Sequence, residues 1–81
     1  MGVLEGHQNE VWCVKFSHGG EYVASGSKDT TVIVWRVNDF SMKFQLKGHT
    51  EPVLNLSWSP HDKLLLSCGL DNTIKLWGME V

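Results

Sequence analysis

Residues 25–35 read S-G-S-K-D-T-T-V-I-V-W, and this stretch decides the fold. A β-prone run ends in Ser27-Lys28-Asp29-Thr30, turns, and continues as β-branched and aromatic residues up to Trp35. An aspartate in a short polar turn can hydrogen-bond its own backbone, and β-branched residues favour the extended strands on either side. The stretch therefore predicts a β-hairpin.

The same pattern returns in residues 67–77, S-C-G-L-D-N-T-I-K-L-W. One constant offset, 67 − 25 = 42, relates the matching residue types, which are Ser25/Ser67, Asp29/Asp71, Thr31/Thr73 and Trp35/Trp77. Outside the hairpin the same offset relates further identical pairs, among them Gly6/Gly48, His7/His49, Val11/Val53 and Ser17/Ser59. A hairpin that recurs at a fixed interval marks a repeated structural unit. Most other positions differ between the copies, which is typical of a natural sequence rather than an idealised design.

Short β-branched or aromatic segments separated by turn residues predict an all-β chain. We expect the first repeat over residues 1–47, with antiparallel strands at about 11–16, 22–27, 31–37 and 42–46. The second repeat, residues 48–81, has strands at about 53–58, 64–68 and 73–77 and lacks its own outer strand. Residues 1–4 align with the end of a fourth strand, so we expect a partial outer strand able to complete a sheet of another unit.

The composition of the chain argues against a nucleic-acid-binding, a membrane-spanning or a secreted protein. Seven Lys and Arg residues against nine Asp and Glu give a formal net charge of −2, unlike the basic footprint of a nucleic-acid binder. No apolar run reaches the roughly 20 residues of a membrane span, and M-G-V-L-E-G-H does not resemble a secretion signal. Cys13 and Cys68 occupy non-equivalent positions, which favours free, buried thiols in a reducing compartment, the cytoplasm or the nucleus.

The recurring Ser, His and Asp invite comparison with a catalytic triad. A triad needs an exposed nucleophilic oxygen, whereas each serine is predicted to lie mid-strand next to its own tryptophan. A metal site from His7, His49, Cys13 and Cys68 lacks close ligand spacing. His18 and His61 are predicted in solvated surface turns. We therefore expect a protein that is not an enzyme and has neither metal nor cofactor.

Gly-His, about two dozen residues, and then Ser-x-x-x-Asp-x-x-x-x-x-Trp resembles the WD40 repeat of β-propellers, twice over essentially the whole chain. Both repeats depart from the family's Trp-Asp ending, with Trp35-Arg36 and Trp77-Gly78. The resemblance implies two four-stranded antiparallel propeller blades. It also implies two structural tetrads, each a chain of hydrogen bonds in which Asp accepts a hydrogen bond from the His ring, the His ring accepts one from the Ser hydroxyl, and the Ser oxygen accepts one from the Trp indole N–H. The two tetrads are His7, Ser25, Asp29 and Trp35, and His49, Ser67, Asp71 and Trp77.

The resemblance further implies a non-catalytic protein–protein interaction scaffold. By analogy with the family, the side chains aimed at partner proteins or peptides from the top face are Glu10, Trp12, Lys28, Pro52, Leu54 and Leu70. Three of these are large apolar groups where a solvated rim would carry polar ones, and tryptophan is enriched in interface hot spots. Trp12 either contacts a partner or packs on a neighbouring blade, and both remain open.

The sequence of the repeats, for example at Glu10-Val11-Trp12 and at residues 56–60, is similar to that of the opening blades of the WD-repeat scaffold subunits of Gid/CTLH-type ubiquitin ligases. Two blades alone leave sheet faces without neighbours, since propellers close with about 4–8 blades. We expect either the remaining blades of a longer protein or two to four copies of this chain, a homo-oligomer, to close the ring. No nucleic-acid or membrane partner is expected.

Overall fold

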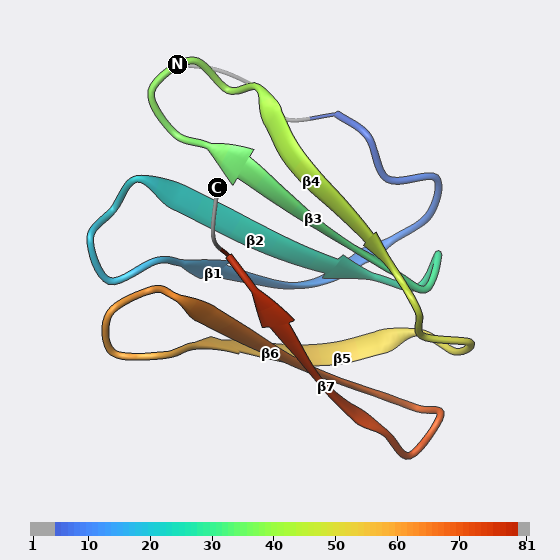
Figure 1. Cartoon of the computed structure of the whole chain (residues 1–81). Helices are drawn as coiled ribbons and strands as arrows, with labels where there is room; N and C mark the ends of the chain where they lie inside the picture. The colour runs from blue at the N-terminus through green and yellow to red at the C-terminus, as the bar shows by residue number, and fades with distance from the viewer. Residues whose placement is uncertain (1–4, 80–81) are drawn as a thin grey trace.

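The computed structural model describes residues 5–79 and consists of two antiparallel β-sheets packed face to face (Figure 1). The first sheet has the order β1-β2-β3-β4 and the second the order β5-β6-β7. The strands are β1 (Val11–Phe16), β2 (Tyr22–Ser27), β3 (Thr31–Arg36), β4 (Met42–Lys47), β5 (Val53–Trp58), β6 (Leu64–Gly69) and β7 (Ile74–Gly78). This arrangement confirms the predicted all-β fold with a second sheet of three strands.

The observed strand bounds differ from the expected ones by a single residue at one or both ends of β3, β4, β6 and β7. The expected partial strand at residues 1–4 lies outside the described residues. Within residues 5–79 there is no helix with the length and apolar character needed to cross a membrane.

The repeat extends to the backbone of the turns. Gly20 and Asp62, which are 42 residues apart, both have positive φ, at 77° and 59°. Thr30 and Asn72 form a second such pair, with φ of 76° and 65°. Equivalent turns therefore adopt the same left-handed conformation with different residues.

A β-bulge interrupts the first strand of each sheet at the same place. The register between β1 and β2 passes from Val11 opposite Ser27 to Cys13 opposite Gly26, so Trp12 has no partner in the ladder. The register between β5 and β6 shifts in the same way and leaves Leu54 without a partner. A bulge redirects the side chain of the extra residue, which makes Trp12 and Leu54 structural equivalents.

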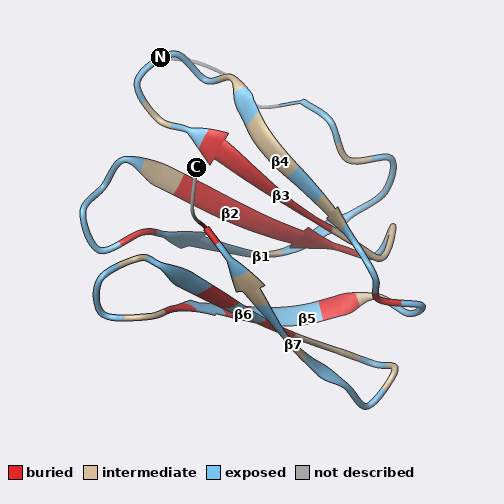
Figure 2. Ribbon diagram, viewed as in Figure 1, coloured by how far each residue is buried: buried red, intermediate tan, exposed pale blue. Residues whose placement is uncertain are grey.

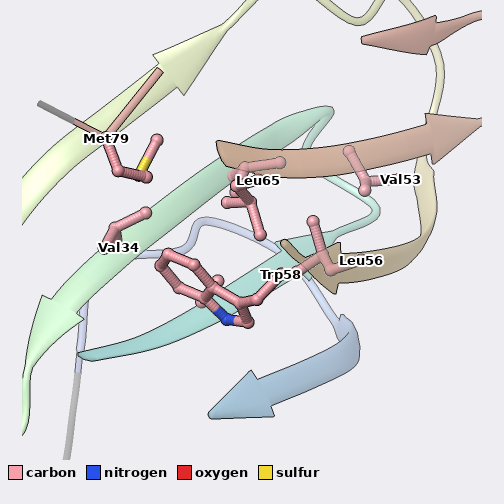
Figure 3. Close-up of a cluster of buried hydrophobic side chains, with 8 residues drawn as sticks. Val34, Val53, Leu56, Trp58, Leu65 and Met79 are labelled. Carbon is pink, nitrogen blue, oxygen red and sulfur yellow. The ribbon is translucent and has the colours of Figure 1, made fainter. Parts of the chain in front are cut away.

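The main core lies between the two sheets, at a contact that we call the junction. Side chains alternate across a strand, so each sheet has two faces. We call the side of the first sheet turned toward the second its trailing face, formed by Tyr22, Ala24, Val32 and Val34. It meets the leading face of the second sheet, formed by Val53, Leu56, Trp58 and Leu65, and Met79 completes the cluster (Figures 2 and 3).

Polar contacts at one edge fix the junction. The Trp58 indole N–H donates to the Lys15 carbonyl at 3.0 Å, and the Trp58 ring stacks on Tyr22 with centroids 6.5 Å apart. The Asp62 carboxylate accepts from the backbone N–H groups of His18 and Gly19, each at 2.8 Å. The His18 ring also lies 3.2 Å from the Trp58 carbonyl, so this turn is an interface element as well as an exposed loop.

Candidate functional site

A chain of hydrogen bonds links the segment before β1 to β2, β3 and the turn between them. The His7 ring lies 2.9 Å from Asp29 through Nδ1 and 2.6 Å from Ser25 Oγ through Nε2. The Trp35 indole donates to the same serine oxygen at 3.1 Å. An ionised carboxylate only accepts, so the Nδ1–H of His7 donates to Asp29, while Nε2 of the same ring faces the Ser25 hydroxyl.

The second sheet holds the same arrangement at the 42-residue offset. His49 lies 2.9 Å from Asp71 and 2.7 Å from Ser67, and the Trp77 indole donates to Ser67 at 2.8 Å. The structure thus brings all eight proposed tetrad residues into two separate hydrogen-bonded groups.

A threonine joins each group, although we did not assign it a role from the sequence. Thr31 donates its hydroxyl to Asp29 at 2.6 Å and its backbone N–H at 2.9 Å, and the Gln8 N–H donates at 2.9 Å. Partial burial raises the pKa of Asp29, but the hydrogen bonds from Thr31, Gln8 and His7 outweigh it and hold that pKa well below the usual range. The sequence did hold an indication of this role, because threonine recurs at the 42-residue offset as Thr31 and Thr73.

Asp71 has the equivalent partners. The Thr73 hydroxyl donates at 2.6 Å, and hydrogen bonds from Thr73, His49 and the Thr50 backbone hold the pKa of Asp71 well below its ordinary value against the effect of burial. Both aspartates are therefore ionised acceptors that order the turn between the second and third strands of each sheet.

Ser25, His7 and Asp29 have the connectivity of a triad, but the serine is covered. Ser25 is 6% exposed, and its oxygen already accepts the Trp35 indole N–H. A cavity of about 130 Å³ on this side of the first sheet is lined by His7, Val11, Val14, Val23, Ser25 and Trp35. A nucleophilic serine needs an accessible oxygen beside an oxyanion hole, so this geometry favours a structural role.

Both cysteines carry free thiols, and they are half-buried rather than fully buried as expected. Burial raises the pKa of the Cys13 thiol, which keeps it protonated and poorly nucleophilic. Among residues 5–79, no three His, Cys, Asp or Glu side chains converge as a metal ion would require.

The structure gathers the proposed partner-binding residues into two equivalent groups at the ends of the sheets near the β2–β3 and β6–β7 turns. The Lys28 N–H donates to the Glu10 carbonyl at 2.9 Å, and the Leu70 N–H donates to the Pro52 carbonyl at 3.0 Å. Each bond holds a turn against the segment preceding the bulged strand. We call the two groups together the top surface, which comprises Glu10, Trp12, Lys28, Pro52, Leu54 and Leu70.

Three apolar side chains of the top surface are exposed, namely Trp12 at 41%, Leu54 at 44% and Leu70 at 51%. None belongs to either buried cluster of the described chain. The Lys28 ammonium and the Glu10 carboxylate lie 4.0 Å apart, and such an exposed ion pair contributes little to stability.

A larger cavity of about 560 Å³ lies at the opposite end of the first sheet, and sequence reasoning missed it. Its charged lining comprises Glu21, Arg36, Asp39 and Lys43, with the Lys43 ammonium 2.9 Å from the Tyr22 hydroxyl. Two cations and two carboxylates favour no particular ligand charge. Its residues come from two turns and from the ends of β2, β3 and β4, so no compact motif could have signalled it.

Comparison with known proteins agrees with this geometry. The family model described as WD domain, G-beta repeat, matches residues 1–36 and 40–78, and the chain belongs to this WD40 family. WD repeat proteins generally mediate protein–protein interactions, and the family is generally non-catalytic.

Curated relatives include two from Arabidopsis thaliana, a WD repeat-containing protein 26 homolog and a WD repeat-containing protein WDS homolog. They are 43% and 44% identical over 81 residues that cover 96% of this chain. Protein HIRA of Takifugu rubripes is 36% identical over 93 residues, covering 91% of this chain. The matched region spans 14%, 16% and 9% of these three relatives.

Proposed function

We propose that this chain is a non-catalytic protein-binding module and that its top surface contacts the partner. The observation that carries the proposal is the recurring bulge, which presents Trp12 and Leu54 as exposed apolar groups at the same end of both sheets. Tryptophan is enriched in interface hot spots, and the exposed leucines beside it add apolar contact area of the kind that marks interaction sites. The buried Ser25 supports a binding role over catalysis.

The partner class is a protein or peptide. At a finer level we propose a scaffold or substrate-recruiting role in a ubiquitin ligase complex, in the cytoplasm or the nucleus. The similarity of the repeat wording to Gid/CTLH-type scaffold subunits supports it. The test is co-purification of ligase subunits with the chain, and a partner set without any such subunit would remove this finer proposal while leaving the binding module intact.

The top surface is tested by substitution. Trp12→Ala and Leu70→Ser should each weaken capture of a partner that binds the unmodified chain, with β-structure and thermal stability nearly unchanged. Phe40→Ala is the matched control, because Phe40 is 46% exposed in the β3–β4 turn at the opposite end of the first sheet. A collapse of stability in Trp12→Ala, or equal loss of binding in Phe40→Ala, would contradict the proposal.

Further sheets are expected to cover the outer faces, either other blades or copies of this chain. The exposed apolar strands on both outer faces support a need for such neighbours. Four residues that differ from their repeat equivalents, Phe16, Gly20, Pro60 and Cys68, favour other blades over copies of the chain.

A further inference from the structure

Each sheet leaves one apolar face exposed, and the two exposed faces are the repeat equivalents of the two faces buried in the junction. On the trailing face of the second sheet, Leu64, Leu66, Ile74 and Leu76 correspond to Tyr22, Ala24, Val32 and Val34. Burial differs sharply between equivalents, since Ile74 is 73% exposed and Val32 is 0% exposed.

The leading face of the first sheet shows the same contrast. Val11, Val14 and Phe16 correspond to Val53, Leu56 and Trp58, and Phe16 is 65% exposed whereas Trp58 is 7% exposed. A second copy of the chain could therefore place the leading face of its first sheet against the trailing face of the second sheet, with the same pairs of equivalent residues in contact as in the junction. Such a head-to-tail contact closes into a ring or continues as an open filament.

We propose that four residues make the exposed leading face of the first sheet and the exposed trailing face of the second sheet incompatible. A second copy of the chain therefore does not dock on the second sheet in the way that the second sheet docks on the first. The four are Phe16, Gly20, Pro60 and Cys68, which replace the junction residues Trp58, Asp62, His18 and Gly26. The proposal concerns the sheet faces and is independent of partner binding at the top surface.

The first mismatch is steric. A Cβ added at Gly26 would lie 2.7 Å from Val53 Cγ1, a separation that forces one group to move. The trailing face of the second sheet has Cys68 at the equivalent position, and the incoming copy would present Val11 in place of Val53. The Cys68 side chain therefore prevents a second copy from approaching the second sheet as closely as the two sheets approach each other at the junction.

The second mismatch removes the carboxylate of the Asp62 contact and one of its two backbone donors, so that the His61 N–H, the counterpart of that of Gly19, is the donor that remains. In the junction, the Asp62 carboxylate accepts backbone N–H groups of His18 and Gly19 at 2.8 Å. The incoming copy would offer Gly20, which has no carboxylate. The receiving turn would offer Pro60, which has no backbone N–H.

The third mismatch concerns the indole. Trp58 donates to the Lys15 carbonyl at 3.0 Å in the junction, but its counterpart Phe16 has no donor. The carbonyl that would receive the bond, that of Ser57, would be covered without its partner. Covering an unpaired backbone carbonyl is unfavourable.

Two double variants test the proposal by converting one face each. Phe16→Trp/Gly20→Asp gives the leading face the junction residues, and Pro60→His/Cys68→Gly does the same for the trailing face. Aspartate suits position 20 because φ is 77° there and 59° at Asp62. Each variant carries one converted face, so a mixture should assemble as a heterodimer and stop at two chains.

Sedimentation of the mixture over a concentration series gives the result. We expect a dissociation constant roughly tenfold or more below that for self-association of the unmodified chain or of either variant alone. Far-UV circular dichroism and a cooperative melt establish that each variant folds. If a Cys68→Gly variant fails to fold, the pair Gly20→Asp and Pro60→His tests the carboxylate contact alone.

Two outcomes overturn the proposal. One is self-association of the unmodified chain as tight as that of the mixture. The other is folded variants whose mixture associates no more tightly than its components. Adding Trp12→Ala to both variants should leave the heterodimer unchanged, which separates failure here from failure of the top-surface proposal.

Discussion

The Thr31 hydroxyl donates a hydrogen bond of 2.6 Å to the Asp29 carboxylate, which also accepts a hydrogen bond of 2.9 Å from the His7 ring. The carboxylate therefore joins the β2–β3 turn to the segment before β1. Replacing Asp29 by alanine leaves these donors without their acceptor. We expect Asp29→Ala to lower the free energy of unfolding by about 1–3 kcal/mol, measured by urea denaturation. A loss below about 0.5 kcal/mol, the usual range for surface substitutions, would contradict a structural role.

Stability should fall in acid. The folded-state pKa values of Asp29 and Asp71 are depressed, and those of Asp39 and Asp62 are lowered as well. A depressed carboxylate contributes stability above its unfolded pKa of about 3.9 and loses it as pH falls through the folded value. The urea midpoint should therefore decrease progressively below about pH 5. The double variant Asp29→Asn/Asp71→Asn should show a flatter profile, and an unchanged slope would refute the assignment.

Gly26 permits the close approach of the two sheets. A methyl group there would lie 2.7 Å from Val53 Cγ1 and 2.9 Å from Cys13 Sγ. Gly26→Ala should destabilise the chain by about 1–3 kcal/mol, as overpacking does, and shift the thermal midpoint down. Gly78→Ala is the control, since a Cβ there meets nothing within 4 Å. Val53→Ala in the Gly26→Ala background should recover part of the loss, and failure to do so would place the strain elsewhere.

Thr30 has a backbone conformation that suits its counterpart better. Its φ is 76°, and Asn72 occupies the equivalent turn position with φ of 65°. Left-handed backbone is unfavourable for a β-branched residue and is tolerated by asparagine. Thr30→Asn should stabilise the chain by roughly 1 kcal/mol, and Asn72→Thr should destabilise it by a similar amount. Thermal denaturation of both variants provides the measurement, and changes of the same sign in the two would argue against this explanation.

The sequence was sufficient for the all-β fold and for the pairs of equivalent residues, because a hairpin repeated without insertion fixes which residues correspond. It was not sufficient for burial. Phe16 and Trp58 occupy equivalent positions, yet only Trp58 is buried, since only the second sheet has its leading face covered. A pattern along one strand does not indicate which face acquires a neighbour.

Two other features also escaped sequence reasoning. The bulges at Trp12 and Leu54 depend on hydrogen-bond register, which the identity of those residues does not encode. The turn containing His18 was expected to be solvated, but its backbone binds Asp62 of the second sheet. This contact joins turns 44 residues apart in sequence, and nothing local to either turn indicates the other.

The outer strand of the first sheet and the hydrogen-bonded turn of the second are separated by very little chain. β4 ends at Lys47, and His49 is already bound to Asp71 at 2.9 Å. Peeling β4 away from β3 therefore pulls on the second sheet, and loosening Asp71 releases the end of β4. We therefore expect the two sheets to unfold as one cooperative unit, so that probes placed in either sheet report the same transition.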